Sequence, residues 1–107
     1  MAIAPKTLAG GQLANAKGTL YTTPGSTETI ITSIKLVNTN TSAEAVNLYI
    51  KPNGGTSRRI IPVDMSLGIG YMLEEDNRFT LEAGALIEGD TTTASKVDYI
   101  IMGIEKT

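Results

Sequence analysis

The sequence predicts an all-β fold: a single antiparallel β-sandwich, jelly-roll-like, with about seven or eight strands and an extended N-terminal arm. After residue 17, apolar residues recur at every second position in most segments, which is the period of a half-buried strand. Turn residues such as Pro, Gly and Asn interrupt these segments at intervals of about 8 to 12 residues. Hydrophobic residues make up 41% of the 107 residues and charged residues 19%, and Thr, Ser, Asn and Gly fill the difference, as is typical of pleated surfaces joined by tight turns.

The N-terminal segment differs from the rest of the chain. We expect residues 1–17 to form an arm and residues 18–107 to form the β-sandwich domain. The arm carries isolated apolar residues, Ile3, Leu8 and Leu13, whose spacing fits neither a helix face nor a strand. These three residues therefore need another surface, on this chain or on a neighbouring subunit, and they are candidate interface residues.

The first strands of the domain lie on either side of a turn. "GTLYTT" predicts a short strand from Gly18, and "PGS" after it predicts a type II turn with Pro24 at its first corner and Gly25 next. A long strand is expected over residues 28–38. Its alternation places Ile30, Thr32, Ile34 and Leu36 on one face and Ile31, Ser33, Lys35 and Val37 on the other.

The middle of the chain continues the pattern with shorter segments. After a polar connection, Ala45–Lys51 predicts a strand with Val46, Leu48 and Ile50 facing inward. "PNGG" ends it, and a further strand is expected around residues 58–61. In "LGIGYML" the alternation of Ile69, Tyr71 and Leu73 suggests another strand, which "EEDN" then ends.

The C-terminal third predicts the strongest strand. One or two short strands are expected on either side of Ala83-Gly84 in "RFTLEAGALIEGD". In the last strand, residues 96–105, the side chains of Val97, Tyr99 and Ile101 oppose those of Asp98, Ile100, Met102 and Ile104. Because its final part is apolar on both faces, this strand is expected to be central in a sheet or covered by a partner.

Two absences exclude most chemistry. The chain has no Cys, which excludes disulfides, Cys-ligated zinc and thiol catalysis, and no His, which removes the commonest general base and metal ligand. A net charge of −2 supplies no basic field for nucleic acid or an anionic membrane. No signal peptide and no apolar run long enough to span a bilayer is recognisable. We therefore expect no enzyme, no cofactor, no metal and no small-molecule substrate.

The remaining charged motifs have structural explanations. Glu74-Glu75-Asp76 lacks the spacing of a calcium loop and is expected to be a solvated turn. Glu82 and Glu88 could pose as an acid–base pair, but the chain offers one Phe, four Tyr and no Trp for a sugar platform. Arg58-Arg59 is the one basic pair, and on a strand the two side chains point to opposite faces. Either one is solvated, or it pairs with a carboxylate of a neighbouring protein, so both are candidate interface residues.

The strand and turn motifs resemble a group of small structural proteins of tailed bacteriophages. The resemblance covers roughly residues 19–105. It rests on three segments: "LYTTPGSTETIITSIKLVNTNTSAEAVNLYIKPNGG", "RRIIPVDMSLGIGYMLEE" and "FTLEAGALIEGDTTTASKVDYIIMGIE". It implies a β-sandwich component of the virion and carries no catalytic motif.

Within that group the compact domain and its arm favour a capsid decoration (cement) protein, which bridges and stabilises major capsid subunits. The expected location is the outer capsid surface of the virion, after assembly in the host cytoplasm. The major capsid protein is the expected partner, together with self-association into a dimer or trimer, without nucleic acid or membrane. The alternative is a tail, neck or fibre-associated structural protein, or a receptor- or glycan-binding module there.

Overall fold

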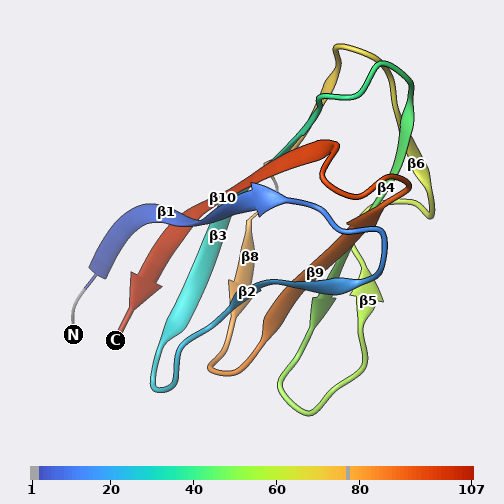
Figure 1. The fold of residues 1–107 in the computed structure, drawn as a ribbon. Coiled ribbons are helices and arrows are strands. Elements are labelled where there is room, and N and C mark those ends of the chain that lie inside the picture. Colours follow the sequence, from blue (N-terminus) through green and yellow to red (C-terminus); the bar gives the residue numbers. More distant parts are fainter. Residues whose placement is uncertain (1–2, 77) are drawn as a thin grey trace.

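The computed structural model describes residues 3–76 and 78–107, which form ten β-strands. All strand pairs are antiparallel (Figure 1). The strands are β1 (Ile3–Gln12), β2 (Gly18–Thr22), β3 (Glu28–Asn38), β4 (Glu44–Lys51), β5 (Arg58–Arg59), β6 (Met65–Leu67), β7 (Met72–Glu75), β8 (Phe79–Leu81), β9 (Leu86–Thr91) and β10 (Val97–Lys106). None of the described residues belongs to a helix long and apolar enough to cross a membrane.

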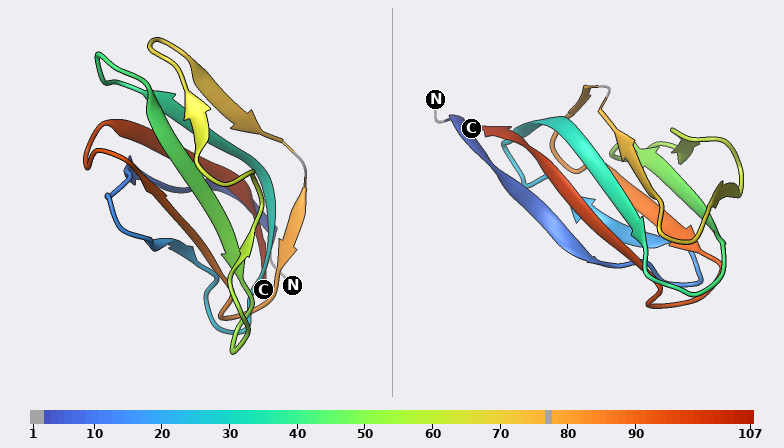
Figure 2. Two further views of the ribbon diagram at one scale, coloured as in Figure 1. Left: turned by 90° about the vertical axis from the view of Figure 1, so that its right-hand side faces the viewer. Right: turned by 90° about the horizontal axis from the view of Figure 1, so that it is seen from above.

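The strands form two five-stranded sheets with jelly-roll topology. Sheet A has the order β1-β10-β3, with β7 and β8 both paired to the far side of β3. Sheet B has the order β2-β9-β4, with β5 and β6 both paired to β4. Because β7 and β8 share one position in sheet A and β5 and β6 share one in sheet B, the ten strands occupy eight positions. The predicted jelly-roll-like sandwich is confirmed, and Figure 2 shows its two layers.

The hydrophobic core lies between the two sheets. Its side chains come from both layers, because alternate residues of each strand point inward. The buried apolar residues are Leu13, Tyr21, Ile31, Ile34, Leu36, Val46, Leu48, Ile61, Leu67, Leu81, Ala85, Ile87, Val97 and Ile101.

The predicted faces of β3 are right for its second half and wrong for its first. Ile34 and Leu36 are fully buried as expected, but Ile31 is buried while Ile30 is half-exposed. The cause is a β-bulge in the pairing of β3 with β10, where the register shifts between Met102 and Gly103. One extra residue in β3 reverses the alternation, so a strictly two-residue period misassigns the residues before it.

Two further local predictions are wrong, one about a turn and one about a strand. In the β2–β3 turn the residue with positive φ is Ser26 (57°) and not Gly25, so a type II turn centred on Pro24-Gly25 does not form. The expected strand through Ile69 is broken by a turn, in which Gly70 has a φ of 75° and the Tyr71 N–H donates to the Gly68 carbonyl (3.1 Å).

The N-terminal segment is the edge strand of sheet A in this structure. Residues 3–12 pair with residues 98–106 of β10, with a bulge in the N-terminal segment between Thr7 and Ala9. Leu13 follows with no exposed surface, and its backbone N–H donates to the Val97 carbonyl (2.9 Å). The surface that the segment needs is thus supplied by this chain. The division into an arm and a separate domain stays a prediction.

A partly buried polar cluster connects β1 and β10 of sheet A with β2 of sheet B. The Tyr21 hydroxyl of sheet B donates to Glu105 Oε2 (2.7 Å) and lies 2.9 Å from Thr29 Oγ1 of sheet A. The same Glu105 carboxylate receives Lys6 Nζ of β1 at 2.6 Å. Burial, together with the neighbouring Glu105, raises the pKa of Tyr21 to about 12. The bonds from Lys6 and Tyr21 hold the pKa of Glu105 below its usual value.

Candidate functional site

The outer face of sheet B is a closed polar network centred on Asn47. The Asn47 amide nitrogen donates to Asp90 Oδ1 (2.8 Å) and Asp64 Oδ1 (3.0 Å). Its carbonyl oxygen accepts from Arg59 Nη1 (2.5 Å) and from the Asp64 backbone N–H (2.9 Å). Asn47 is 5% exposed, so these neighbours cover it almost completely. This face satisfies its polar groups within the chain.

Tyr49 extends this network along β4. The Arg59 guanidinium carbon lies 4.9 Å from the centre of the Tyr49 ring, and Lys17 Nζ lies 4.8 Å from it. Burial and the nearby Asp90 carboxylate raise the pKa of Tyr49. A cation over an aromatic face is attracted by the ring, so both basic groups are held by their own chain.

The outer face of sheet A is apolar along its central strand. Val97 and Ile101 of β10 are fully buried and Tyr99 between them packs against the core, so the alternate residues, such as Asp98 and Ile100, point away from the core. Ile100 is 42% exposed. The outward residues of β10 are Asp98, Ile100, Met102, Ile104 and Lys106. Their apolar register neighbours include Pro5 on β1 and Ile30 and Val37 on β3, and Val37 in turn pairs with Met72 on β7. Their polar register neighbours are Thr7 and Gln12 on β1 and Glu28, Ser33 and Lys35 on β3. We refer to the β10 residues Ile100, Met102 and Ile104 as the apolar stripe.

A shallow hollow lies beside the stripe. Its volume is about 460 Å³, and it runs between β1, β10 and β3. The residues that line it are Pro5, Lys6, Thr7, Thr32, Met102, Gly103 and Ile104. An exposed face of aliphatic side chains with a polar rim is typical of a surface that contacts another protein.

A second apolar surface lies at one end of the sandwich, in the β6–β7 turn and the first residue of β7. Ile69, Tyr71 and Met72 are 61%, 70% and 55% exposed, and we call these three residues the apolar tip. A groove of about 190 Å³ opens beside them. It is lined by Val46, Met65, Ser66, Leu67, Gly68, Tyr71, Met72 and Leu73.

The tip is held by the side chain of Asn38, which is 4% exposed. Asn38 Nδ2 donates to the backbone carbonyl oxygens of Leu67 (2.9 Å) and Gly68 (3.2 Å). The same nitrogen lies 3.0 Å from the backbone carbonyl oxygen of Ser42. The Asn38 backbone N–H donates to the Tyr71 carbonyl (3.2 Å). The tip is therefore ordered before any partner arrives, which lowers the entropy cost of binding.

Glu44 fixes the neighbouring loops at the same end. Its carboxylate is 2% exposed and accepts from Asn40 Nδ2 (2.9 Å), the Thr93 N–H (2.8 Å) and Thr91 Oγ1 (3.0 Å). Burial works to raise the pKa of Glu44, but these donors together outweigh it and the pKa lies below its usual value. The β3–β4 and β9–β10 connections are thus joined through one buried anion.

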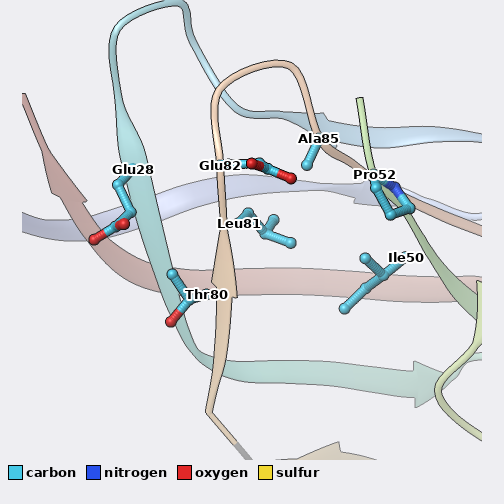
Figure 3. Close-up of a pocket in the computed structure, with 7 residues that line it drawn as sticks. All are labelled: Glu28, Ile50, Pro52, Thr80, Leu81, Glu82 and Ala85. Carbon is cyan, nitrogen blue, oxygen red and sulfur yellow. The ribbon is translucent and has the colours of Figure 1, made fainter. Parts of the chain in front are cut away.

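The cavity at the opposite end shows no catalytic arrangement. It has a volume of about 300 Å³ and lies between β8 and β4, where Leu81 and Ile50 point toward each other (Figure 3). Glu82 lies beside it, but Glu88 is not among its lining residues and accepts a hydrogen bond from Ser57. The two carboxylates considered as an acid–base pair are therefore not brought together. Among the described residues no group of three or more Asp or Glu could hold a metal ion.

The five candidate interface residues do not form one surface. Ile3 pairs with Lys106 through its backbone, Leu8 is half-buried against the core, and Leu13 is fully buried in it. Arg58 and Arg59 lie on β5 in sheet B; Arg59 packs on Tyr49 and Arg58 is exposed beside Ile50. An interface role for these residues stays a prediction.

Sequence reasoning missed the apolar tip and used only part of the signal for the stripe. The two apolar faces of the last strand indicated either a central position or a partner, and β10 is central while its outer face is uncovered. For the tip, the alternation of Ile69, Tyr71 and Leu73 concealed the turn; Gly68 and Gly70 were the available signal.

Comparison with solved structures finds similar folds in a pilus protein and in proteins of a viral particle. The chain is similar to a subunit of the disulfide-linked pili that form Bacillus endospore appendages, with a TM-score of 0.58, 15% identity, and coverage of 98% of this chain and 88% of that one. It is also similar to a chain of the T13 particle of infectious bursal disease virus, with a TM-score of 0.59, 10% identity and coverage of 97% of this chain. The VP2 subviral particle of that virus gives a TM-score of 0.51, 14% identity and 97% coverage.

These likenesses are likenesses of fold. This chain spans 30–32% of the length of the two viral chains. It has no Cys, so the disulfide links of the pili have no counterpart in it. No protein-family model and no curated protein sequence matches the chain.

Proposed function

We propose that this protein is a non-enzymatic structural protein of a tailed-phage virion, and that it decorates the capsid by bridging and stabilising major capsid subunits. The sequence resemblance to small phage structural proteins suggests the virion. The jelly-roll fold, which this chain shares with proteins of viral particles and pili, supports an assembly role. The proposed location is the outer surface of the shell.

The observation that carries the proposal is the contrast in polarity between the outer face of sheet B and the apolar tip. Sheet B presents a polar network satisfied within the chain, whereas the apolar tip exposes three large hydrophobic side chains on a turn fixed by buried hydrogen bonds. A rigid apolar surface of this kind suits docking against a preformed protein surface.

We assign the capsid contact to the apolar tip. Tyr71 and Met72 are the most suitable anchors, because an aromatic ring and a flexible thioether fill pockets of a partner well. Many such contacts on one shell would act together through multivalency, so each contact can be weak. Arg58, which is exposed at the edge of sheet B, is available for an added ion pair with a capsid carboxylate.

The alternative is a receptor- or glycan-binding module on a tail, neck or fibre. The cavity of about 300 Å³ is the candidate site for it, and it is lined by Glu28, Ile50, Pro52, Thr80, Leu81, Glu82 and Ala85. Since no aromatic residue lines this cavity, it lacks the stacking surface that sugars require, which favours decoration.

Localisation in the particle tests the proposal. Cryo-electron microscopy of particles that carry the protein, with capsid and tail reconstructed separately, should show a small jelly roll repeated over the icosahedral shell, with residues 69–72 toward the shell. Density confined to the neck or tail tip would contradict decoration and support the alternative.

A further inference from the structure

The edges of both sheets are protected, so copies of this protein are not expected to join edge to edge. On β1, Pro5 has no N–H to donate, Lys6 follows it, and a bulge interrupts the strand after Thr7. The β2 edge is bulged between Thr19 and Tyr21. The opposite edges consist of the short strands β5, β6, β7 and β8, of two to four residues each. Association is therefore left to the faces and ends of the sandwich.

The outer face of sheet A has a symmetric pattern along β10. Its outward residues, in order, are Asp98, Ile100, Met102, Ile104 and Lys106. An acidic residue begins the row, a basic residue ends it, and the apolar stripe between them is centred on Met102. Read in the opposite direction, the row again has a charged residue at each end and three apolar residues between them, but the acidic and basic ends have changed places.

From this pattern we infer that the outer face of sheet A binds a second copy of this chain, in a face-to-face dimer whose β10 strands run antiparallel. The two-fold axis passes beside Met102, and Ile100 of each copy packs on Ile104 of the other. Asp98 of each copy then faces Lys106 of the other, so the dimer contains this ion pair twice. An isologous contact requires such self-complementarity.

The charges on β3 agree with the same axis. Lys35 lies in the row of Ile100, and Glu28 lies in the row of Lys106, on the other side of the centre. The two-fold operation brings Lys35 of one copy to within one row of Glu28 of the other. A parallel arrangement would instead place Lys106 over Lys106 and Asp98 over Asp98, with like charges opposed.

The dimensions allow the contact and limit its strength. A strand of ten residues is roughly 33 Å long and four strand positions span about 19 Å, so the face measures on the order of 600 Å². Aligned sheets cross at about 30°, which displaces the strand ends by roughly 7 Å, within reach of an extended Lys side chain. Because a standard interface buries about 800 Å² per partner, we expect a weak dimer, with a Kd of about 1–100 µM.

The dimer would complete the proposed bridging. The apolar tip lies at the Asp98 end of sheet A, since Met72 pairs with Val37 and Val37 with Asp98. An antiparallel dimer therefore carries its two tips at opposite ends. One dimer could then contact two capsid subunits, which is the part of the inference that rests on the proposed function.

Sedimentation of the purified protein tests the dimer in the absence of any particle. The wild type should show concentration-dependent dimerisation at about 50 mM salt, where exposed charges are weakly screened. Ile100→Lys, which changes an exposed residue of the stripe, should raise the Kd at least about 30-fold. Val63→Lys is the matched control, because Val63 is a 61% exposed apolar residue outside this face, and it should leave the Kd unchanged.

A charge exchange tests the orientation. Asp98→Lys or Lys106→Asp alone should each raise the Kd about tenfold, since like charges then face each other at two places. The double variant D98K/K106D should restore the Kd to within about threefold of wild type. Ile100 and Val63 are exposed, whereas Asp98 and Lys106 are half-exposed, and Lys106 Nζ also lies 3.5 Å from Glu28 Oε1 of its own copy. Thermal unfolding of each variant will therefore verify the fold.

Three results would overturn the inference. The first is a wild type that remains monomeric at about 200 µM. The second is a dimer Kd for Val63→Lys as high as that for Ile100→Lys, and the third is a Kd for D98K/K106D no lower than that of either single variant. A monomeric wild type would leave decoration intact, because a monomer can still occupy a shell. Absence of the protein from the shell in cryo-electron microscopy would contradict decoration and leave the dimer intact.

Discussion

At the scale of single residues, polar side chains inside the sandwich hold together parts that are distant in sequence. Asn38 fixes the β6–β7 turn, Glu44 joins two loops, and Tyr21 connects the sheets through Thr29 and Glu105. Asn38, Glu44 and Tyr21 each have hydrogen-bond partners, so each is stabilising only while those partners remain.

Any side chain at position 103 in place of Gly103 is expected to destabilise the fold. A Cβ atom there would lie against the Ile30 carbonyl oxygen and 2.9 Å from Leu8 Cδ1, at the bulge between β3 and β10. We expect Gly103→Ala to lower the free energy of unfolding by about 2–3 kcal/mol, because backbone atoms must move. Urea unfolding will measure this. Gly25→Ala is the control, since a Cβ at Gly25 meets no atom within 4 Å.

Tyr21 should make the fold sensitive to alkaline pH. Its folded pKa of about 12 lies above the ordinary value of 10.0, so ionisation favours the unfolded chain. Its stabilising contribution is complete below pH 10 and is lost as the pH rises through 12. At about pH 11 the loss is roughly 1 kcal/mol. Urea midpoints at pH 8 and pH 11 should differ less in Tyr21→Phe than in wild type.

The matched control for this pH effect is Tyr71→Phe. Tyr71 is 70% exposed, so its replacement should leave the alkaline loss of stability unchanged. An equal pH dependence in wild type and Tyr21→Phe would contradict the assignment of the effect to Tyr21.

At the scale of elements, β1 decides how sheet A is completed. Without it β10 would be an edge strand, and its outer face would lose Pro5 and Thr7 as neighbours. Leu13 fastens the end of β1 to the core, through both its buried side chain and its backbone bonds to Val97 and Ser95. The N-terminal segment thus contributes to the stability of the sandwich.

Leu13→Ala measures that contribution. We expect a loss of about 2–5 kcal/mol in the free energy of unfolding, the range for a fully buried Leu. Leu8→Ala should cost less, because Leu8 is only half-buried. A cost below about 1 kcal/mol for Leu13→Ala would instead favour an arm that is separable from the domain.

At the scale of the whole molecule, the jelly roll separates three surfaces. Sheet B faces outward with a satisfied polar network, sheet A with an apolar stripe, and one end carries the apolar tip. The proposed roles follow this division: the stripe binds a second copy and the tip binds the capsid.

Variants of the tip test its role directly. Ile69→Ser and Tyr71→Ser change exposed residues, so stability should change by no more than about 0.5 kcal/mol. Binding to shells that lack the protein should nevertheless fall at least about tenfold, measured by co-sedimentation with the particles. Val63→Ser is the control for loss of an exposed apolar residue. Full occupancy by both tip variants would assign attachment to another surface.

The sequence by itself determined the fold class, the inward face of β4, and the absence of Cys and His chemistry. These depend on residue type and on a two-residue period, which are local properties. Strands β2, β3 and β9 also appear where their patterns predicted them, because each lies between clear turn residues.

Only the tertiary structure decided where the pattern breaks and which surfaces remain uncovered. The bulge that buries Ile31 arises from pairing with Gly103, more than 70 residues away, where the absence of a Cβ lets the strands approach. Leu13 enters the core because β10 offers a free edge to β1. In each case a partner distant in sequence determines the burial, and a local pattern contains no information about that partner.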